Sequence, residues 1–375
     1  MSVLTFVLLA VGFLALIAGG EVLVRGASGL ARSLGLSPLV IGLTVVSFAT
    51  SAPELAVTLD ASLSGRPGLA VGNVVGSNIV NVLLVLGFSA LFLPLAVRSA
   101  VTKRDVPVMI ALSVLLLVLA LDGSISQLDG VVLVLLLLAY VAYSVRAGRR
   151  HYKEDRADEE SGADEGMKPP HRPWVDAVLV LAGVALLVVG ARSLVTSATE
   201  IATALGLSEL IIGLTVVAIG TSLPELATSV VAAARGEREL AVGNVVGSNI
   251  FNIGAVMGIV ATVSPGGVPV EPSAVNFDLP VMVAVAVALL PIAFTGYGIA
   301  RWEGGLFVAY YAAYTLFLLL DATTHDALPE YSALMLSFVV PLTALTLMLL
   351  AVYELGVRKG RRQERRAQTR ADRGT

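Results

Sequence analysis

The sequence predicts an all-α polytopic membrane protein of about eleven transmembrane helices, built as two inverted five-helix repeats plus one extra C-terminal helix. Only 14% of the 375 residues are charged and 56% are hydrophobic, with a mean hydropathy of +0.87. A soluble domain carries about 25% charged residues. Apolar stretches of about 20 residues, each long enough to cross a bilayer, recur along the chain. Finally, two motifs each occur twice at one spacing.

The apolar stretches define the spans in chain order. The first begins at the N-terminus and has no basic region before it, so we interpret it as a true span and not as a cleaved signal peptide. The predicted spans are residues 2–24, 37–64, 69–95, 106–122, 129–146, 174–196, 208–234, 240–263, 278–296, 302–320 and 332–355.

The distribution of basic residues predicts the orientation. An N-terminus outside the cell sends 23 of the 25 Lys and Arg to the cytoplasmic side, with Arg66 and Arg192 as the exceptions. The sequence therefore predicts a multi-pass protein of the cell membrane whose central linker and C-terminus are cytoplasmic. The same bias supports the eleventh span, because ten would leave the basic tail outside.

An internal repeat divides the chain. Residues 42–54 match 213–225 at nine of thirteen positions, and 70–81 match 241–252 at eleven of twelve, both at an offset of 171. Each repeat contains five spans, an odd number, so the second half is inverted relative to the first. Inverted repeats are typical of secondary transporters, whose sites lie near the membrane midplane between the repeats.

The predicted domains follow from this repeat. The first repeat covers 1–146 with its motif region at 42–87, and the second covers 174–320 with its motif region at 213–258. Residues 321–375 form the extra helix and a basic tail. The charged segment 147–173 is expected to be a flexible cytoplasmic linker, with a regulatory cation site on its acidic residues as a minor alternative.

Four spans carry an oxygen-rich face on an otherwise apolar helix. Their polar residues recur mostly at spacings of three or four, which place them on one side of a helix. They are Thr44, Ser47, Ser51, Glu54 and Thr58; Asn73, Ser77 and Asn81; Thr215, Thr221, Ser222, Glu225 and Ser229; and Asn244, Ser248 and Asn252.

Glu54 and Glu225 are the acidic residues near the middle of a span. A charge at that depth is costly unless it is paired or lines a watery cavity. No Lys or Arg lies at matching depth, so protons or bound cations must neutralise the carboxylates. Pro53 and Pro224 precede them and cannot donate to the carbonyls four residues earlier.

Freed carbonyls, hydroxyls, amides and carboxylates are hard oxygen ligands. They suit Ca²⁺, which takes six to eight oxygens at about 2.3–2.6 Å, and Na⁺ accepts similar groups. The chain has no Cys, and its three His lie between spans, so a transition-metal site is not expected.

Other conspicuous residues have simpler structural explanations. Small residues often serve only to pack membrane helices closely. We assign packing to Thr44, Thr58, Thr215, Ser229, Gly72, Gly76, Gly243 and Gly247, backbone bridging to Asn78 and Asn249, and helix capping to Asp105 and Asp278.

At these motifs the chain resembles the cation/Ca²⁺ exchanger superfamily, in particular its prokaryotic sodium/calcium exchanger branch. The resemblance rests on T-S-x-P-E and G-N-x-x-G-S-N, each present twice. It implies a pair formed by the first and sixth spans that slides against an eight-helix core. It assigns ion contacts to Thr50, Ser51, Glu54, Ser77, Asn81, Thr221, Ser222, Glu225, Ser248 and Asn252, and to backbone oxygens of Ser47 and Ala218.

Two positions depart from the family pattern. Ala49 stands where Gly is commoner, as at Gly220. Asn252 stands where some members have Asp, so this site has only two carboxylates. The smaller negative charge of the site affects how many Na⁺ could exchange for each Ca²⁺ and whether K⁺ could be cotransported.

The predicted function is antiport of Na⁺ against Ca²⁺ by alternating access, with both ions competing for one midplane site. The expected partners are the lipid bilayer and inorganic cations, with no cofactor, no nucleic acid and a monomer as the functional unit. The first alternative is a proton/Ca²⁺ exchanger using the same two glutamates. A passive cation channel is a more distant one. An enzyme is not expected, because no catalytic constellation lies in the spans.

Overall fold

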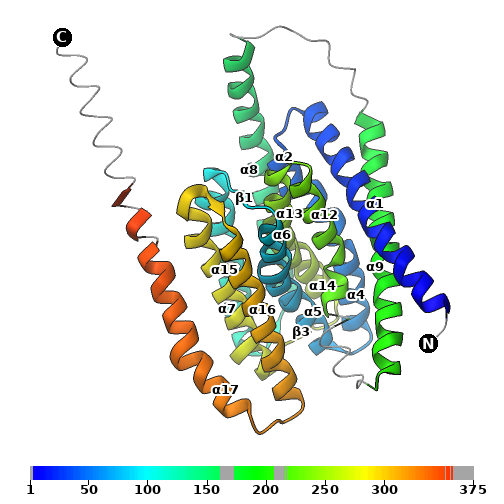
Figure 1. The fold of residues 1–375 in the computed structure, drawn as a ribbon, viewed down its shortest axis with the longest axis vertical. Helices are drawn as coiled ribbons and strands as arrows, with labels where there is room; N and C mark the ends of the chain where they lie inside the picture. The colour runs from blue at the N-terminus through cyan, green and yellow to red at the C-terminus, as the bar shows by residue number, and fades with distance from the viewer. Residues whose placement is uncertain are drawn as a thin grey trace.

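The computed structural model describes residues 3–160, 173–206, 216, 218–350, 352–354 and 356–357, and these are helical almost throughout (Figure 1). Within these ranges, nine helices are long and apolar enough to cross a membrane, or ten if the bent pair Pro38–Thr50 and Ala52–Leu63 is one span. The all-α polytopic fold is thereby confirmed. The count of eleven stays a prediction, because most of 207–217, where the seventh span should begin, lies outside the described residues. So do linker residues 161–172 and the tail from 358.

The first half of the chain runs to the end of the fifth span. Its helices are α1 (Val3–Leu34), α2 (Pro38–Ile41), α3 (Ser47–Thr50), α4 (Ala52–Leu63), α5 (Pro67–Val80), α6 (Gly87–Phe92), α7 (Val106–Leu119) and α8 (Gln127–Glu160). Single π-helical segments at Gly42–Val46, Asn81–Leu86 and Val101–Asp105, a 3₁₀ turn at Ala120–Asp122, and strands β1 (Leu95–Ala96) and β2 (Ser124–Ile125) complete it.

The second half repeats this order. Its helices are α9 (Pro173–Ala204), α11 (Ala218–Thr221), α12 (Leu223–Ala234), α13 (Arg238–Phe251), α14 (Gly258–Val263), α15 (Leu279–Phe294) and α16 (Arg301–Ala322). Between them lie π-helical segments Asn252–Met257 and Ala274–Asp278, a 3₁₀ turn at Thr295–Tyr297, and strands β3 (Val268–Pro269) and β4 (Gly298–Ile299). Helix α17 (Leu328–Leu334) and the π-helical segment Met335–Val339 follow at one edge of the bundle (Figure 1).

Three predicted boundaries are wrong, and one is the end of the sixth span, which was expected at residue 196 although α9 continues to Ala204. The first span was expected to end near residue 24, but α1 continues to Leu34. The linker was expected to be flexible from residue 147, but α8 continues through it to Glu160. Residues 149–160 contain no Gly or Pro, and half of them are Arg or Glu. Because these residues favour helix, the span continues beyond its apolar part.

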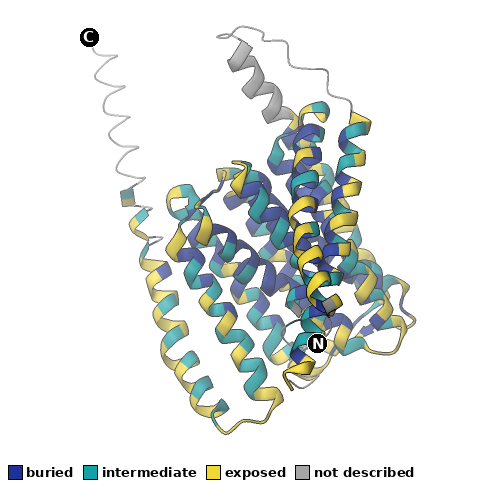
Figure 2. Cartoon of the chain, turned by 45° about the vertical axis from the view of Figure 1, so that its right-hand side comes forward, coloured by how far each residue is buried: buried dark blue, intermediate teal, exposed yellow. Residues whose placement is uncertain are grey.

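Two helical segments form the centre of the molecule. In the most apolar stretch of Pro67–Phe92, 78% of the residues are buried, and in that of Arg238–Val263, 89% are buried. In the other spans the buried share is 6–39%. The outer helices present their exposed residues outwards, and the buried ones gather in the middle (Figure 2). The segment Leu328–Glu354, at 6%, is the least covered span. The apolar outer surface suits lipid, and the central pair suits a site enclosed by protein.

Helices α1 and α9 pack against each other along their length (Figure 1). Glycines allow this closeness: a Cβ on Gly183 would lie 2.6 Å from the backbone nitrogen of Leu23, and one on Gly12 would lie 2.9 Å from the carbonyl oxygen of Gly190. The Thr5 hydroxyl also donates to a carboxylate oxygen of Glu200 at 2.7 Å. The first and sixth spans therefore form a pair, as the resemblance implies.

Equivalent contacts occur in the two halves. Strand β1 pairs with β4 and β2 with β3, so each short sheet joins one half to the other. The Tyr140 hydroxyl donates to Asp105 at 3.1 Å, and the Tyr314 hydroxyl donates to Asp278 at 3.0 Å. A two-fold relation between the halves would produce such matched contacts.

The capping role expected for Asp105 and Asp278 is wrong. Neither side chain makes a capping hydrogen bond to its helix. Asp105 instead accepts from Arg104 at 2.6 Å and from Tyr140, and Asp278 accepts from Tyr314. In each half, the aspartate accepts from a tyrosine of the helix that follows, Tyr140 of α8 or Tyr314 of α16.

The contact between α13 and the segment Gly42–Val46 generates a stability prediction. A Cβ on Gly247 would lie 2.8 Å from the Cα of Leu43 and would also meet the Ser47 hydroxyl. Gly247→Ala should therefore lower the free energy of unfolding by ~1–3 kcal/mol, as overpacking does, measured as thermal unfolding in detergent. Gly305→Ala is the control, because its nearest neighbour is a side-chain methyl of Leu91 at 3.3 Å. Equal melting temperatures for the two variants would contradict the assignment.

Candidate ion-binding site

Each glutamate follows a break in its helix. Ser51 (φ −81°, ψ 1°) separates α3 from α4, and Ser222 (φ −92°, ψ 7°) separates α11 from α12. The segments Pro38–Thr50 and Ala52–Leu63 meet at 41°. Pro53 and Pro224 lie in the first turn of the following helix, where their missing N–H is tolerated. The sequence-predicted break at each proline is confirmed.

The two carboxylates are fully enclosed and unbonded. Glu54 is 1% exposed and Glu225 is 0% exposed. All four carboxylate oxygens are buried, and none has a hydrogen-bond partner among the residues that the structure describes. Asn244 links the two broken helices, because its side-chain oxygen is 3.3 Å from the Thr50 hydroxyl and its N–H₂ donates to the backbone carbonyl of Glu225 at 3.5 Å. Each is in the first turn of its helix, where the helix dipole favours a negative charge.

Further buried polar atoms of the predicted site have no hydrogen-bond partner in the described ranges. More than nine in ten buried polar groups in proteins are hydrogen-bonded, so a concentration of unpaired ones marks a place built for another ligand. The predicted site residues with buried, unpaired side-chain atoms are Ser51, Ser77, Asn81, Ser222 and Asn252, besides the two glutamates.

The helices that carry these residues come from opposite halves. Helix α4, which carries Glu54, packs against the segment Asn252–Met257, and α12, which carries Glu225, packs against Asn81–Leu86. Each of these segments is a π-helical turn that begins at the asparagine. Such turns are frequent at functional sites because they redirect side chains and carbonyls. Each carboxylate thus adjoins the asparagine-bearing helix of the other half.

Thr50 and Ser248 lie together across the interface between the halves. The Thr50 hydroxyl is 3.4 Å from the Ser248 hydroxyl and 3.3 Å from the side-chain oxygen of Asn244. The N–H₂ of the same Asn244 donates to the backbone carbonyl of Glu225 at 3.5 Å. The hydroxyl hydrogens can rotate, so both oxygens remain available to a cation.

The other predicted contacts are less direct. The Ser47 hydroxyl is 2.6 Å from the carbonyl oxygen of Gly42 and 2.9 Å from that of Asn244, so its side chain ties two helices together. Its backbone carbonyl accepts from the N–H of Ser51 at 3.0 Å and from the Thr50 hydroxyl at 3.5 Å. Thr221 is half-buried at the end of α11, and Ala218 begins that helix.

Asn73 and Asn244, which the sequence placed on the oxygen-rich face, brace the broken helices. The Asn73 amide donates to the Thr58 hydroxyl at 2.9 Å and to the carbonyl of Glu54 at 3.3 Å. The Asn244 amide makes the equivalent bonds to Ser229, at 3.1 Å, and to the carbonyl of Glu225, at 3.5 Å. Each asparagine therefore fixes the helix that carries its own half's glutamate.

One polar residue near Glu225 was missed. The Thr228 hydroxyl is buried and unpaired three residues after Glu225, on the same side of α12. The matching residue of the first half is Val57, so the repeat gives no signal for it. Spacing from Glu225 alone would have found it.

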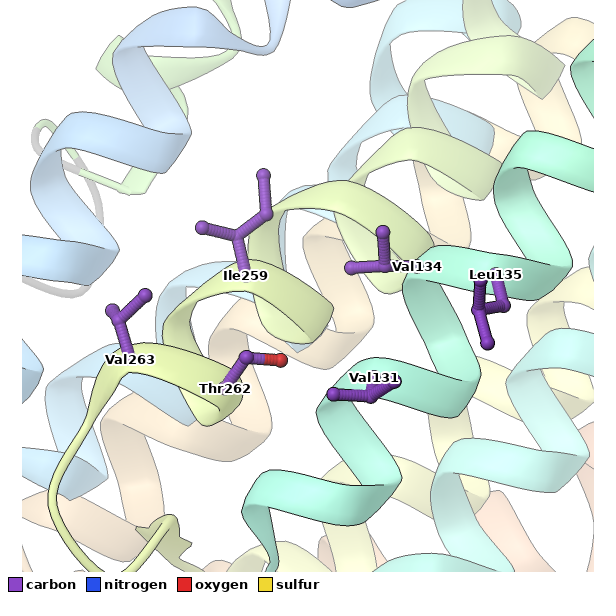
Figure 3. Close-up of a pocket in the computed structure, with 6 residues that line it drawn as sticks. All are labelled: Val131, Val134, Leu135, Ile259, Thr262 and Val263. Atoms are coloured by element: carbon purple, nitrogen blue, oxygen red, sulfur yellow. The ribbon is translucent and has the colours of Figure 1, made fainter.

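A hollow lies between α8 and α14, and its lining differs in chemistry from the surroundings of the two carboxylates (Figure 3). It has a volume of about 220 Å³ and is lined by aliphatic side chains such as Val131, Leu135 and Ile259. Its one side-chain hydroxyl, that of Thr262, donates to the carbonyl of Gly258 at 2.7 Å. This hollow lacks the free oxygens that a cation requires.

A sequence model described as "Sodium/calcium exchanger protein" matches residues 4–146 and 175–320. The chain belongs to this family. It is 34% identical over 349 residues to the sodium/calcium exchanger MaX1 of Methanosarcina acetivorans, covering 85% of this chain and 99% of the relative. It is 40% identical over 285 residues to the inner membrane protein YrbG of Escherichia coli K12, covering 75% and 86%. A solved structure of the sodium-calcium exchanger NCX_Mj superposes with a TM-score of 0.70 at 34% identity, covering 83% of this chain and 97% of that one.

The unpaired hydroxyl of Ser222 generates a prediction about ion binding and stability. A buried polar group without a partner costs ~1–3 kcal/mol, so Ser222→Ala should raise the melting temperature of ion-free protein. It should also reduce the further stabilisation that Ca²⁺ produces by binding the folded state. Thermal unfolding with and without Ca²⁺ measures both effects.

Ser89→Ala is the matched control, because that buried hydroxyl already donates to the carbonyl of Val85 at 2.8 Å. It should lower the melting temperature and leave the Ca²⁺-induced shift unchanged. The assignment of Ser222 would be wrong if both variants kept the full shift.

Proposed function

We propose that this protein is an antiporter that exchanges Na⁺ for Ca²⁺ across the cell membrane, with both ions competing for the site around Glu54 and Glu225. The proposal is carried by the four unbonded carboxylate oxygens buried at the centre of a membrane protein. Membership of the sodium/calcium exchanger family supports the same ions.

Electrostatics supports a divalent cation in the site. An isolated charge in the membrane interior costs about 3 kcal/mol on insertion scales, and two adjacent carboxylates also repel each other. One Ca²⁺ cancels both charges at once, whereas Na⁺ requires two ions. No Lys or Arg in the described residues pairs with either carboxylate. Neutralisation must therefore come from the transported ions or from protons.

The ligand set supports competition between the two ions. Carboxylates from α4 and α12, amide oxygens of Asn81 and Asn252, and serine hydroxyls can together provide the six to eight oxygens that Ca²⁺ takes. Na⁺ needs the same oxygens to leave water, so the ions exclude each other. If the protein changes access only when the charges are neutralised, exchange becomes obligatory and a leak is prevented.

The two halves support alternating access. The matched strands, the matched tyrosine–aspartate bonds and the shared offset of 171 residues fit an inverted repeat, which allows one structure to open to either side. We infer an N-terminus outside, with the linker and tail in the cytoplasm. Arg66, one exception to the charge bias, pairs with Asp60 at 3.1 Å.

The test is uptake of radioactive Ca²⁺ into proteoliposomes loaded with Na⁺ and diluted into choline. Uptake should require internal Na⁺ and fall at least a hundredfold in Glu54→Gln, which keeps the size of the side chain and removes its charge. Glu330→Gln is the matched control, because Glu330 lies exposed in α17. It should transport at the wild-type rate.

Three outcomes would contradict the proposal in different ways. Uptake driven by an imposed pH gradient without Na⁺ would identify a proton/Ca²⁺ exchanger using the same site. Flux that needs no counter-ion would identify a channel. Normal exchange by Glu54→Gln would show that the cation site is not the one around Glu54 and Glu225.

A further inference from the structure

Four buried asparagines meet where α5 and α13 cross at the centre of the bundle. Asn78 and Asn81 come from the first half, and Asn249 and Asn252 occupy the matching positions 171 residues later. All four are at most 2% exposed. Only Asn81 and Asn252 belong to the proposed cation site, and the other two have no part in the function argued so far.

Asn252 is held in one orientation. Its side-chain N–H₂ donates to the side-chain oxygen of Asn78 at 3.2 Å, while its own side-chain oxygen is buried and unpaired. An amide has an acceptor on one side and donors on the other. Because Asn78 takes the donor side, the oxygen of Asn252 is left free on the opposite side, where it can bind a cation.

Asn78 is itself oriented by its neighbours. Its N–H₂ faces the sulfur of Met282 at 3.5 Å, which is a weak acceptor. Its backbone carbonyl accepts from the side chain of Asn249 at 3.4 Å. The contact with Met282 keeps the Asn78 amide nitrogen on the side of α15, and the side-chain oxygen of Asn78 is on the side of Asn252.

The matching bond in the other half is absent. It would run from the N–H₂ of Asn81 to the side-chain oxygen of Asn249, but both of these atoms are buried and unpaired. Asn249 instead directs its N–H₂ to the Asn78 carbonyl and to the sulfur of Met109, 3.4 Å away. Within the described part of the chain, no partner therefore fixes the orientation of the Asn81 amide.

We propose that Asn78 is a positioning residue that holds the amide of Asn252 with its oxygen toward the cation, and that no equivalent residue holds Asn81. One amide oxygen is then preset for the ion, and the other turns toward it on binding. This inference rests on the proposed function, since it takes Asn252 as a ligand.

The choice of Asn at position 252 makes the positioning necessary. A carboxylate presents an oxygen whichever way it turns, whereas an amide rotated by 180° presents N–H₂ and repels a cation. Asn252→Asp should therefore remove the need for Asn78. The two residues should be energetically coupled only while position 252 is an amide.

A double-mutant cycle tests this coupling. The variants are Asn78→Leu, which is similar in size but offers no acceptor, Asn252→Asp, and the two combined, with Ca²⁺ affinity measured by equilibrium binding to the full-length protein in detergent. Asn78→Leu should weaken binding about tenfold when residue 252 is Asn and less than twofold when it is Asp. Asn78→Ala enters the same cycle if the leucine variant does not fold.

Asn249→Leu is the matched control, because the side chain of Asn249 bonds no cation-site side chain. It should change affinity by the same factor with either residue at 252. An equal loss from Asn78→Leu in both backgrounds would show a merely structural role and overturn the proposal. Failure of the proposed function is distinguishable, because Glu54→Gln would then bind Ca²⁺ as tightly as the wild type.

Discussion

The structure depends on one electrostatic constraint: two carboxylates, Glu54 and Glu225, lie enclosed by protein in a membrane, and no Lys or Arg in the described residues pairs with them. In water, hydration would stabilise the two negative charges, but enclosure by protein removes that stabilisation. The break in each helix, the hydroxyls of Ser51 and Ser222 at those breaks, and the unpaired amide oxygens nearby all provide what a cation needs. Without a cation or protons, the same arrangement would be a costly defect in the core.

Each half of the chain completes the site of the other. The broken helix of one half packs against the asparagine-bearing helix of the other, and glycines such as Gly243 and Gly247 permit the close approach. Asn73 and Asn244 brace the two breaks with equivalent hydrogen bonds. The central helices are thus cross-connected by hydrogen bonds, while the outer helices bury a much smaller share of their apolar residues.

Composition and repetition predicted the fold class, the breaks and the two carboxylates, because each follows from a strong local signal. An apolar stretch of fixed length implies a span, a proline implies a break, and a lone acid in a span implies a site. The continuation of α8 to Glu160 was missed because hydropathy marks where a membrane ends and not where a helix ends. The bonds of Asp105 and the link between Asn78 and Asn252 depend on contacts between distant segments. No spacing along the chain reveals which side of an amide will face a neighbour.

The most direct test of the account is to locate the ion. Crystals grown with Ca²⁺ and measured at a wavelength where calcium scatters anomalously would show its position. We expect a single strong peak between Glu54 and Glu225, with ligand oxygens from both halves at about 2.3–2.6 Å. A peak elsewhere, with the two carboxyl groups hydrogen-bonded to each other, would contradict the central claim.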